Sequence, residues 1–241
     1  MERETDEKIH ALLQGLKSED WRVRMSATKE LTKLRQVSVN VMGALLKNVE
    51  DQDWFVRKTV VETLGNLRPP SQQAIVALIR ALGDVDWSVR KISVWAIDSL
   101  GCASEAVDAL CERLKDEHPA VQISAADALS RVQGSNEQII PLLMIALWDN
   151  QSEVRRSVVS TLSILGQGSE QVTNTLIEQR KDNSEIVRAA VAQGLGSSRR
   201  PTGQIKTALR ELQKDEIPFV REVAERSLKR LKEKQGHPFY Q

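Results

Sequence analysis

The sequence returns to one short motif at an almost constant interval. The motif ends in Val followed by a basic or amide residue, and that last residue is taken as the anchor of each repeat. The anchors are Arg24, Arg57, Arg90, Gln122, Arg155, Arg188 and Arg221, at intervals of 33, 33, 32, 33, 33 and 33 residues. An internal period of this length is typical of solenoids, in which each repeat is one supersecondary element that stacks on the next.

Each repeat has the hydrophobic spacing of two α-helices. Leu lies twelve residues before every anchor, and Leu or Ile lies seven residues after it. In the third repeat, Val89, Ser93, Ile97 and Leu100 follow one another at i, i+4, i+8 and i+11, which is one helical face. We call the helix before the anchor the first helix and the helix that contains the anchor the second helix. One such hairpin cannot bury its apolar stripe alone, so neighbouring repeats must stack.

Capping signals agree with this division. Oxygen-bearing residues are expected to cap the first helices: Thr5, Ser38, Ser71, Ser104, Asn136, Ser169 and Thr202. The corresponding residues for the second helices are Asp20, Asp53, Asp86 and Ser184, with Pro119 and Pro218 at the first helical position elsewhere. The sequence therefore predicts an all-α, right-handed α-solenoid of about seven helical hairpins. The expected repeats of one array over residues 1–241 are 4–36, 37–69, 70–102, 103–134, 135–167, 168–200 and 201–233, with a frayed tail at 234–241.

These residues carry a resemblance to a known family. The turn Asp, the Val-Arg anchor and the Ala- or Val-rich second helix resemble the HEAT repeat, and the variant Asp-Trp-x-Val-Arg is similar to the bacterial HEAT-like repeats of phycobilisome lyases. The resemblance covers residues 4–233 and implies that the second helices line a concave face. It also implies a ladder, in which the Asp six residues before one anchor pairs with the anchor Arg of a neighbour. The ladder residues would be Asp51, Asp84, Asp116, Asp149, Asp182 and Asp215, with Ser18 in the first repeat. Gln122 lacks the charge, so the ladder is expected to be weakest in the fourth repeat.

Charge and composition exclude several broad classes. The net charge of +1 argues against a general nucleic-acid coat protein, although residues 101–154 hold nine acids against three bases. There is no signal-peptide pattern and no apolar run of membrane-spanning length, so we expect a cytoplasmic protein that does not enter a membrane. Two cysteines fit a reducing compartment. Cys111 takes a repeat position that is apolar in other repeats, so it is expected in the core. Cys102 lies in a turn and is expected to be accessible.

Tryptophan is the most specific candidate feature. Trp21, Trp54 and Trp87 take the same place in three successive repeats, so stacking would align them along one edge. Each indole either covers the end of its own hairpin or forms an adhesive edge, since Trp is enriched among interface anchors. The row loosely resembles tubulin-binding TOG arrays, but the later turns lack the basic residues that those arrays need.

Trp95 stands in a different column, five residues after the anchor. The other members are polar, namely Lys29, Glu62, Asp127, Ser160, Gln193 and Arg226, so we predict that this column faces solvent and that Trp95 contacts a partner. Neighbouring columns add Lys58, Lys91, Arg156 and Asp98. A groove of mixed charge with one aromatic suits a protein or peptide better than a phosphate backbone. The predicted partner-binding residues are Trp95, Trp21, Trp54, Trp87, Lys58, Lys91, Glu62, Asp98, Asp127 and Arg156.

No catalytic motif, metal-ligand set or cofactor loop is recognisable in the sequence. The His-Glu pairs of the HEAT-like di-iron hydroxylase are missing, and no glycine-rich phosphate loop or nucleophile elbow occurs. We therefore expect a non-enzymatic scaffold without a cofactor that binds a protein or peptide, with nucleic acid disfavoured. Two enzymatic alternatives follow from resemblance alone. One is a bilin lyase or lyase subunit. The other is a HEAT-like DNA glycosylase that would use Asp98 or Asp127 beside Trp95.

Overall fold

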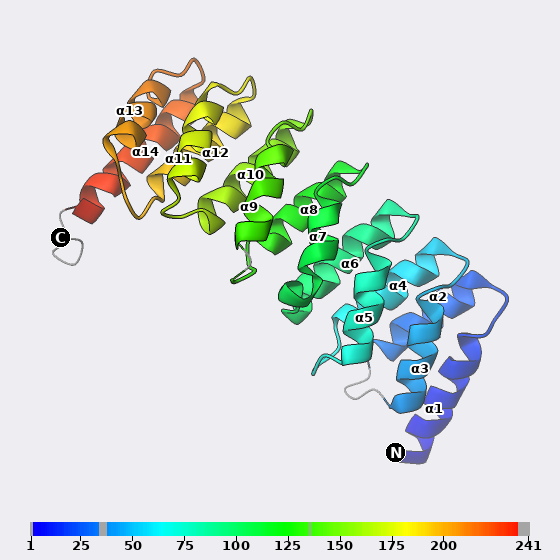
Figure 1. The fold of residues 1–241 in the computed structure, drawn as a ribbon. Helices are drawn as coiled ribbons and strands as arrows, with labels where there is room; N and C mark the ends of the chain where they lie inside the picture. The colour runs from blue at the N-terminus through cyan, green and yellow to red at the C-terminus, as the bar shows by residue number, and fades with distance from the viewer. Residues whose placement is uncertain (1, 34–37, 135, 236–241) are drawn as a thin grey trace. The chain divides into compact units, whose positions relative to one another are not determined.

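The computed structural model describes residues 2–33, 38–134 and 136–235, which form fourteen α-helices, two short 3-10 helices and the turns between them (Figure 1). No strand occurs in these ranges. First and second helices alternate along the chain, so the protein is an all-α solenoid, as the sequence predicts. The chain divides into two compact units, unit 1 (Met1–Arg113) and unit 2 (Leu114–Gln241), and each is described by itself. The single array, its handedness and its repeat boundaries stay predictions.

The helix bounds follow the hairpin pattern. Unit 1 contains α1 (Glu2–Gly15), α2 (Trp21–Leu31), α3 (Val39–Asn48), α4 (Trp54–Gly65), α5 (Gln72–Ala81), α6 (Trp87–Leu100), η1 (Ala103–Ala106) and α7 (Val107–Arg113). Unit 2 contains α8 (Pro119–Leu129), α9 (Asn136–Ala146), α10 (Ser152–Leu165), α11 (Glu170–Glu178), η2 (Gln179–Lys181), α12 (Glu185–Gly196), α13 (Gly203–Leu212) and α14 (Pro218–Gln235). Helix α14 continues to Gln235, past the predicted start of the tail, and residues 236–241 lie outside the described residues.

The second helices of unit 1 begin where the sequence predicts. The carboxylates of Asp20, Asp53 and Asp86 each accept a hydrogen bond from the backbone N–H two residues on, at 2.8, 2.9 and 2.8 Å. In unit 2, His118 caps α8 through Nδ1, which accepts from the N–H of Ala120 at 3.2 Å. The sequence analysis missed this cap, because His is not among the usual N-cap residues.

The first helices match the predicted caps less completely. The hydroxyls of Ser38, Ser169 and Thr202 accept the expected hydrogen bonds. Three predictions are wrong: Thr5 lies inside α1, which already begins at Glu2, Ser104 lies inside η1, and Asn136 is itself the first residue of α9. Ser71 stands at the N-cap of α5 but makes no side-chain capping hydrogen bond. The extra 3-10 turn of η1 delays the start of α7 to Val107, so a serine three residues earlier cannot cap it.

The repeated apolar columns form the core. Leu45, Leu78 and Leu110, twelve residues before their anchors, are fully buried, as is Leu143 in unit 2. The described residues include both cysteines, which are free thiols. Cys111 is buried as predicted. Cys102 is also buried, against expectation, because its thiol turns inward and donates a hydrogen bond to the carbonyl of Ile97 at 3.3 Å.

Small residues let the second helices pack closely. The position eight residues after one anchor lies against the position six residues after the next. Gly65 meets Ala96 in this way in unit 1, and Gly196 meets Ser227 in unit 2. Neighbouring first helices touch only lightly by comparison. The second helices are therefore the more closely packed layer of each unit. That they line a concave face, as the family resemblance implies, stays a prediction.

The predicted ladder is present within both units. Its ion pairs are Arg24–Asp51, Arg57–Asp84, Arg155–Asp182 and Arg188–Asp215, with N–O distances of 2.6, 2.7, 2.8 and 2.7 Å. Each Arg also donates to two backbone carbonyls in the turn before its own second helix. Gln122 replaces the ion pair with one hydrogen bond, from its Nε2 to Asp149 at 3.0 Å. The ladder thus joins adjacent turns and is weaker at Gln122, as predicted.

The ladder makes stability depend on pH at the acidic end. Hydrogen bonds from Arg188 lower the pKa of Asp215; burial opposes this effect, and the backbone N–H of Ile217 and the charges of Arg188 and Arg221 add to the lowering. A lowered pKa in the folded state gives stability that is present above the ordinary Asp value of about 4 and is lost as the pH falls through the folded value. We expect the melting temperature to fall steeply below about pH 4.

Thermal melts followed by circular dichroism between neutral and strongly acidic pH will measure this fall. The variant Asp215→Asn should melt lower than the wild type at pH 7 and should lose less on further acidification, because it has no carboxylate to protonate at this rung. Curves for wild type and variant that run parallel through the acidic range would show that Asp215 does not contribute to the acid sensitivity.

Candidate partner-binding face

The site predicted from the sequence lies mainly on the inner side and the turn edge of unit 1. Trp95 points outward from α6 and is 41% exposed. Its ring lies over Gly65 of α4, and its Cζ3 is 3.2 Å from the position that a Cβ on Gly65 would take. The absent side chain of Gly65 therefore provides the space on which the indole rests. The ring is therefore supported at Gly65 and partly open to solvent.

Trp95 belongs to a stripe that we call the inner stripe. It consists of the positions two before, one after and five after the anchor in α2, α4 and α6. Its residues are Arg22, Met25, Lys29, Phe55, Lys58, Glu62, Ser88, Lys91 and Trp95. All nine are exposed or half-buried, which confirms that this face meets solvent. Four of the nine are basic and one is acidic, so the stripe is more basic than the mixed groove expected from the sequence.

The tryptophan row has an added aromatic member. Trp21, Trp54 and Trp87 are the first residues of α2, α4 and α6. The ring of Phe55 lies between two of them, with centroid distances of 5.8 Å to Trp21 and 4.6 Å to Trp54. Such tilted pairs stabilise their rings beyond simple burial. The sequence analysis missed Phe55 because it compared the tryptophan column and not the column beside it.

The row is neither fully packed nor fully free. Trp54 and Trp87 are each 41% exposed, and Trp21 is half-buried. Cations lie over two of the rings: the Arg22 guanidinium is 4.9 Å from the centroid of Trp21, and the Lys58 ammonium is 5.7 Å from that of Phe55. The three indoles are therefore partly covered and partly open to solvent. Whether they close their hairpin ends or anchor a partner stays a prediction.

The remaining predicted residues divide between the units. Asp98 lies on α6 in unit 1, eight residues after the anchor, which is the position that Gly65 takes on α4 in the seam between neighbouring second helices. Asp127 and Arg156 lie in unit 2, on α8 and α10, so they are not part of the face built here. The carboxylate of Asp127 accepts a hydrogen bond from the Ser157 hydroxyl at 2.7 Å, which gives it a role in joining α8 to α10. A partner contact for any of these residues stays a prediction.

Three further observations concern catalysis and membranes. Among the described residues, no group of three or more His, Cys, Asp and Glu is arranged to hold a metal ion. Burial, followed by the charge of Glu105, raises the pKa of Cys102, and burial with Asp108 raises that of Cys111, so neither thiol is activated as a nucleophile. Within the described ranges, no helix combines the length and apolarity needed to cross a bilayer.

Comparisons with solved structures agree with this fold. The Escherichia coli protein YibA is 19% identical with a TM-score of 0.59, and the match covers 92% of each chain. The complex of CpcE and CpcF of phycocyanin lyase from Nostoc sp. PCC7120 gives 19% identity and a TM-score of 0.53, over 92% of this chain and 94% of that one. A designed armadillo repeat protein in complex with the peptide (KR)4 gives 18% and 0.54, over 91% and 98%. At these identities the likeness concerns the fold.

Sequence comparison identifies the family. No curated protein matches the sequence significantly. A family model of HEAT repeats matches residues 9–98 and 75–163, which together make up more than half of the chain. These ranges include the tryptophan row, Trp95 and the first ladder pairs. With the hairpins, the seam and the ladder in place, the chain belongs to the HEAT-repeat family.

Proposed function

We propose that unit 1 is a protein-binding module that holds an acidic, partly apolar segment of a partner along the inner stripe. The observation that carries the proposal is the position of Trp95, which is 41% exposed and rests on Gly65 at the α6 end of a solvent-facing stripe. Exposed tryptophan on a rigid helical layer is the kind of side chain that supplies most of the energy at protein interfaces.

The charges of the stripe favour an acidic partner. Arg22, Lys29, Lys58 and Lys91 contribute four cations, whereas Glu62 contributes one carboxylate. Complementary charge gives specificity and speeds association, and the aromatic rings supply apolar contact. Because the cations are borne by three adjacent second helices, an extended segment that crosses the helices would meet them in succession. No catalytic group is required, and the proposal is therefore of a scaffold or adaptor.

Three labelled peptides of equal length test this proposal, each alternating Leu with Glu, Lys or Ser. We expect the Glu peptide to bind most tightly by fluorescence anisotropy. Trp95→Ala should weaken that binding about tenfold or more, since an interface anchor is worth about 2 kcal/mol. The melting temperature should hardly change, because the indole lies on the surface.

Trp148→Ala is the matched control, since Trp148 is an exposed tryptophan outside the inner stripe, and it should bind the Glu peptide as the wild type does. Equal affinity for the Glu and Lys peptides would contradict the charge argument. A Trp95→Ala protein that loses helicity would show that the residue is structural. Tighter binding of a single-stranded oligonucleotide than of any peptide would replace the proposal with a nucleic-acid function.

The enzymatic alternative is a bilin lyase subunit. Its support is the HEAT-like repeat pattern and the shared fold with the CpcE–CpcF complex. Incubation with a free bilin distinguishes the two functions, because a lyase subunit would change the absorbance of the pigment, whereas a peptide-binding module would leave it unchanged.

A further inference from the structure

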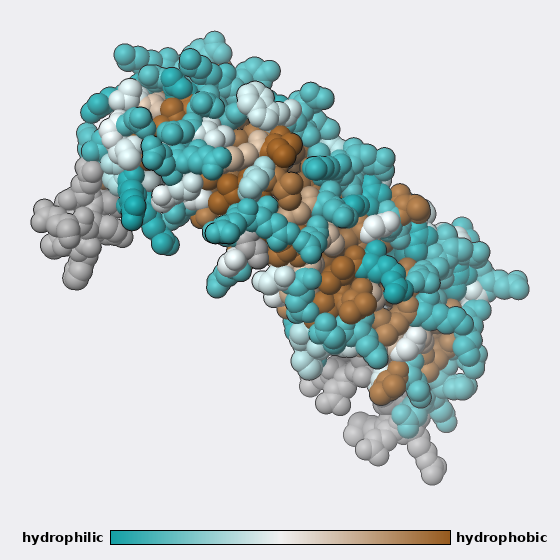
Figure 2. All heavy atoms as spheres, in the orientation of Figure 1, coloured by the Kyte–Doolittle hydropathy of each residue, from teal (hydrophilic) through white to brown (hydrophobic). Residues whose placement is uncertain are grey.

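Unit 2 contains a surface hollow that lies apart from the inner stripe. The hollow has a volume of about 480 Å³ and opens between the turn that follows α9 and the turn that contains η2. Ligand pockets commonly measure about 300–1,000 Å³, so the hollow has room for one long side chain. Figure 2 shows hydrophobic side chains breaking the polar surface in the region of α9 and α10, next to this turn edge.

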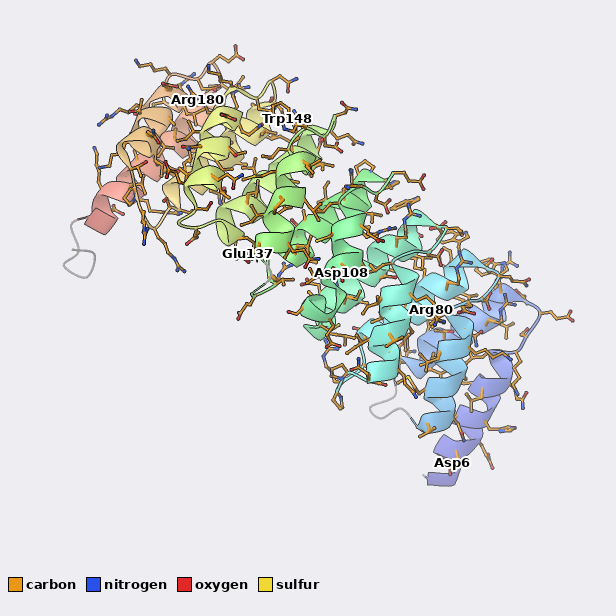
Figure 3. All side chains as sticks on the ribbon, viewed as in Figure 1. Asp6, Arg80, Asp108, Glu137, Trp148 and Arg180 are labelled. Atoms are coloured by element: carbon orange, nitrogen blue, oxygen red, sulfur yellow. The ribbon has the colours of Figure 1, made fainter. Side chains whose placement is uncertain are left out.

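Trp148 forms an aromatic wall of the hollow. It lies at the same end of its hairpin as Arg180 does in the next one, opposite Glu137 on α9 (Figure 3). Trp148 is 78% exposed. The same repeat position, seven residues before the anchor, is polar or glycine in the other repeats: Lys17, Glu50, Gly83, Lys115, Lys181 and Lys214. Stacking of the repeats therefore does not require an indole here.

The carboxylate of Asp149, which also lines the hollow, lacks the cation that the ladder supplies elsewhere. In the next repeat, Asp182 accepts two hydrogen bonds from the guanidinium of Arg155, at 2.8 Å each. Asp149 instead accepts from neutral donors, namely the Gln122 amide at 3.0 Å and the backbone N–H of Gln151 at 2.8 Å. The Asp149 carboxylate therefore keeps lone pairs that can accept from a cation in the hollow.

Arg155 does not fill this vacancy, although it lines the hollow too. Its five N–H groups already donate to the Asp182 carboxylate, to one side-chain amide and to two backbone carbonyls. Its charge is balanced by that of Asp182. The charges that remain in the hollow are the carboxylates of Asp149 and Glu178 against the ammonium of Lys181, so the hollow is acidic.

Gln179 gives an independent indication that the hollow receives a polar group. It is only 8% exposed, yet its side-chain amide forms no hydrogen bond with any described residue. The amide atoms are not sealed inside the core, so they open onto the hollow that the residue lines. The same repeat position is Ala81, Ala146 and Leu212 in three other repeats, so folding does not need an amide. A buried polar group without a partner costs stability, and a ligand that bonds to the amide would offset this cost.

We infer that the hollow binds an arginine side chain of a partner protein. The guanidinium stacks on the indole of Trp148. Its N–H groups donate to the carboxylates of Asp149 and Glu178 and to the side-chain oxygen of Gln179. Arginine suits this site better than lysine, because a planar guanidinium stacks on an aromatic ring and presents several donors in fixed directions. The partner thus supplies the charge that Gln122 does not.

Three capped pentapeptides, Ser-Gly-X-Gly-Ser with X as Arg, Lys or citrulline, test the inference by NMR titration of the isotope-labelled protein. The indole N–H signal of Trp148, assigned by its loss in Trp148→Ala, should shift saturably with the Arg peptide. The dissociation constant should be on the order of 1 mM, because a single side chain is engaged. The Lys peptide should bind roughly threefold more weakly. Citrulline has nearly the shape of arginine without its charge, and its peptide should bind roughly tenfold more weakly.

Substitutions in the hollow separate its parts. Gln179→Leu should weaken the Arg peptide roughly fivefold while the melting temperature stays equal or rises, because a buried amide is lost. Gln122→Arg should weaken it roughly tenfold, because an internal guanidinium then occupies the Asp149 carboxylate. Lys181→Gln should tighten binding roughly twofold, because it removes a competing cation. Glu137→Gln is the matched control: Glu137 is an exposed carboxylate at the other end of α9, and its variant should bind as the wild type does.

Two results would overturn the inference: no shift of the Trp148 indole with the Arg peptide up to about 50 mM, or equal affinity for the Arg and citrulline peptides. Unchanged binding by Gln122→Arg would overturn the assignment of Asp149 as the acceptor. Trp95→Ala should bind the Arg peptide normally while it loses the Glu peptide. This inference and the proposed function of unit 1 can therefore fail separately.

Discussion

Arg155→Ala is expected to lower the free energy of unfolding by about 3–5 kcal/mol, the range for breaking a buried ion pair by removing one partner. The guanidinium donates to both carboxylate oxygens of Asp182 at 2.8 Å and to the side-chain oxygen of Asn183 at 2.9 Å. It also donates to the carbonyls of Asp149 and Asn150. Its removal leaves the Asp182 carboxylate, whose side chain is 6% exposed, without its main partner. Urea unfolding followed by circular dichroism will measure the loss.

A surface ion pair provides the control for this prediction. Arg80 pairs with Glu50 at 3.0 Å, but both side chains are about 70% exposed. Exposed pairs contribute only about 0–1 kcal/mol, so Arg80→Ala should hardly change the urea midpoint. If both Arg variants lose similar stability, burial does not explain the strength of the ladder. The variant Gln122→Arg offers the converse test, because it would supply Asp149 with the charge that this rung lacks.

Gly65→Val is the other substitution for which we expect a large effect. A Cβ at this position would lie 2.6 Å from the Cβ and 2.8 Å from the Cα of Ala96. The second of these atoms is backbone, so α4 and α6 would have to separate. We expect a loss of about 3 kcal/mol, the upper part of the range for overpacked cores. The same shift would remove the surface on which Trp95 rests, so binding of the acidic peptide should fall with it.

Gly43 gives the matched control for the glycine variant. It lies within α3, and a Cβ there would meet nothing within 4 Å. Gly43→Ala should therefore raise stability by about 0.5–1 kcal/mol, because Gly is disfavoured in a helix interior. Thermal melts of the two variants should move in opposite directions. A Gly65→Val protein as stable as the wild type would show that the helix seam tolerates a wider spacing than its small residues suggest.

Much of the fold was accessible from the sequence because it is governed by local and periodic rules. The 3.6-residue periodicity gave the helices, the Asp caps gave the start of each second helix in unit 1, and the 33-residue interval gave the stacking. The ladder was accessible because both partners sit at fixed positions relative to the anchor. Exposure of the Trp95 column followed from its polar members. Each of these features repeats along the chain, so one observation supports another.

Contacts that depend on the volume of a neighbouring side chain were decided only by the tertiary structure. Gly65 supports Trp95 because a seam position of one helix meets the next helix, and the interval alone does not show which positions meet. Phe55 joins Trp21 to Trp54 because the ring sits one position away from the repeated column. Cys102 is buried because its turn directs the thiol inward, towards the carbonyl of Ile97.

The sequence by itself determined the hairpins, their order and the polar or apolar character of each column, because these depend on spacing within a chain. It also contained the apolar residues Pro141, Ile145 and Trp148. Only the tertiary structure decided that they lie exposed and that Lys181 stands next to Trp148, because packing between adjacent hairpins sets which side chains reach solvent together. The same packing determines which indoles rest on glycine and which project into solvent.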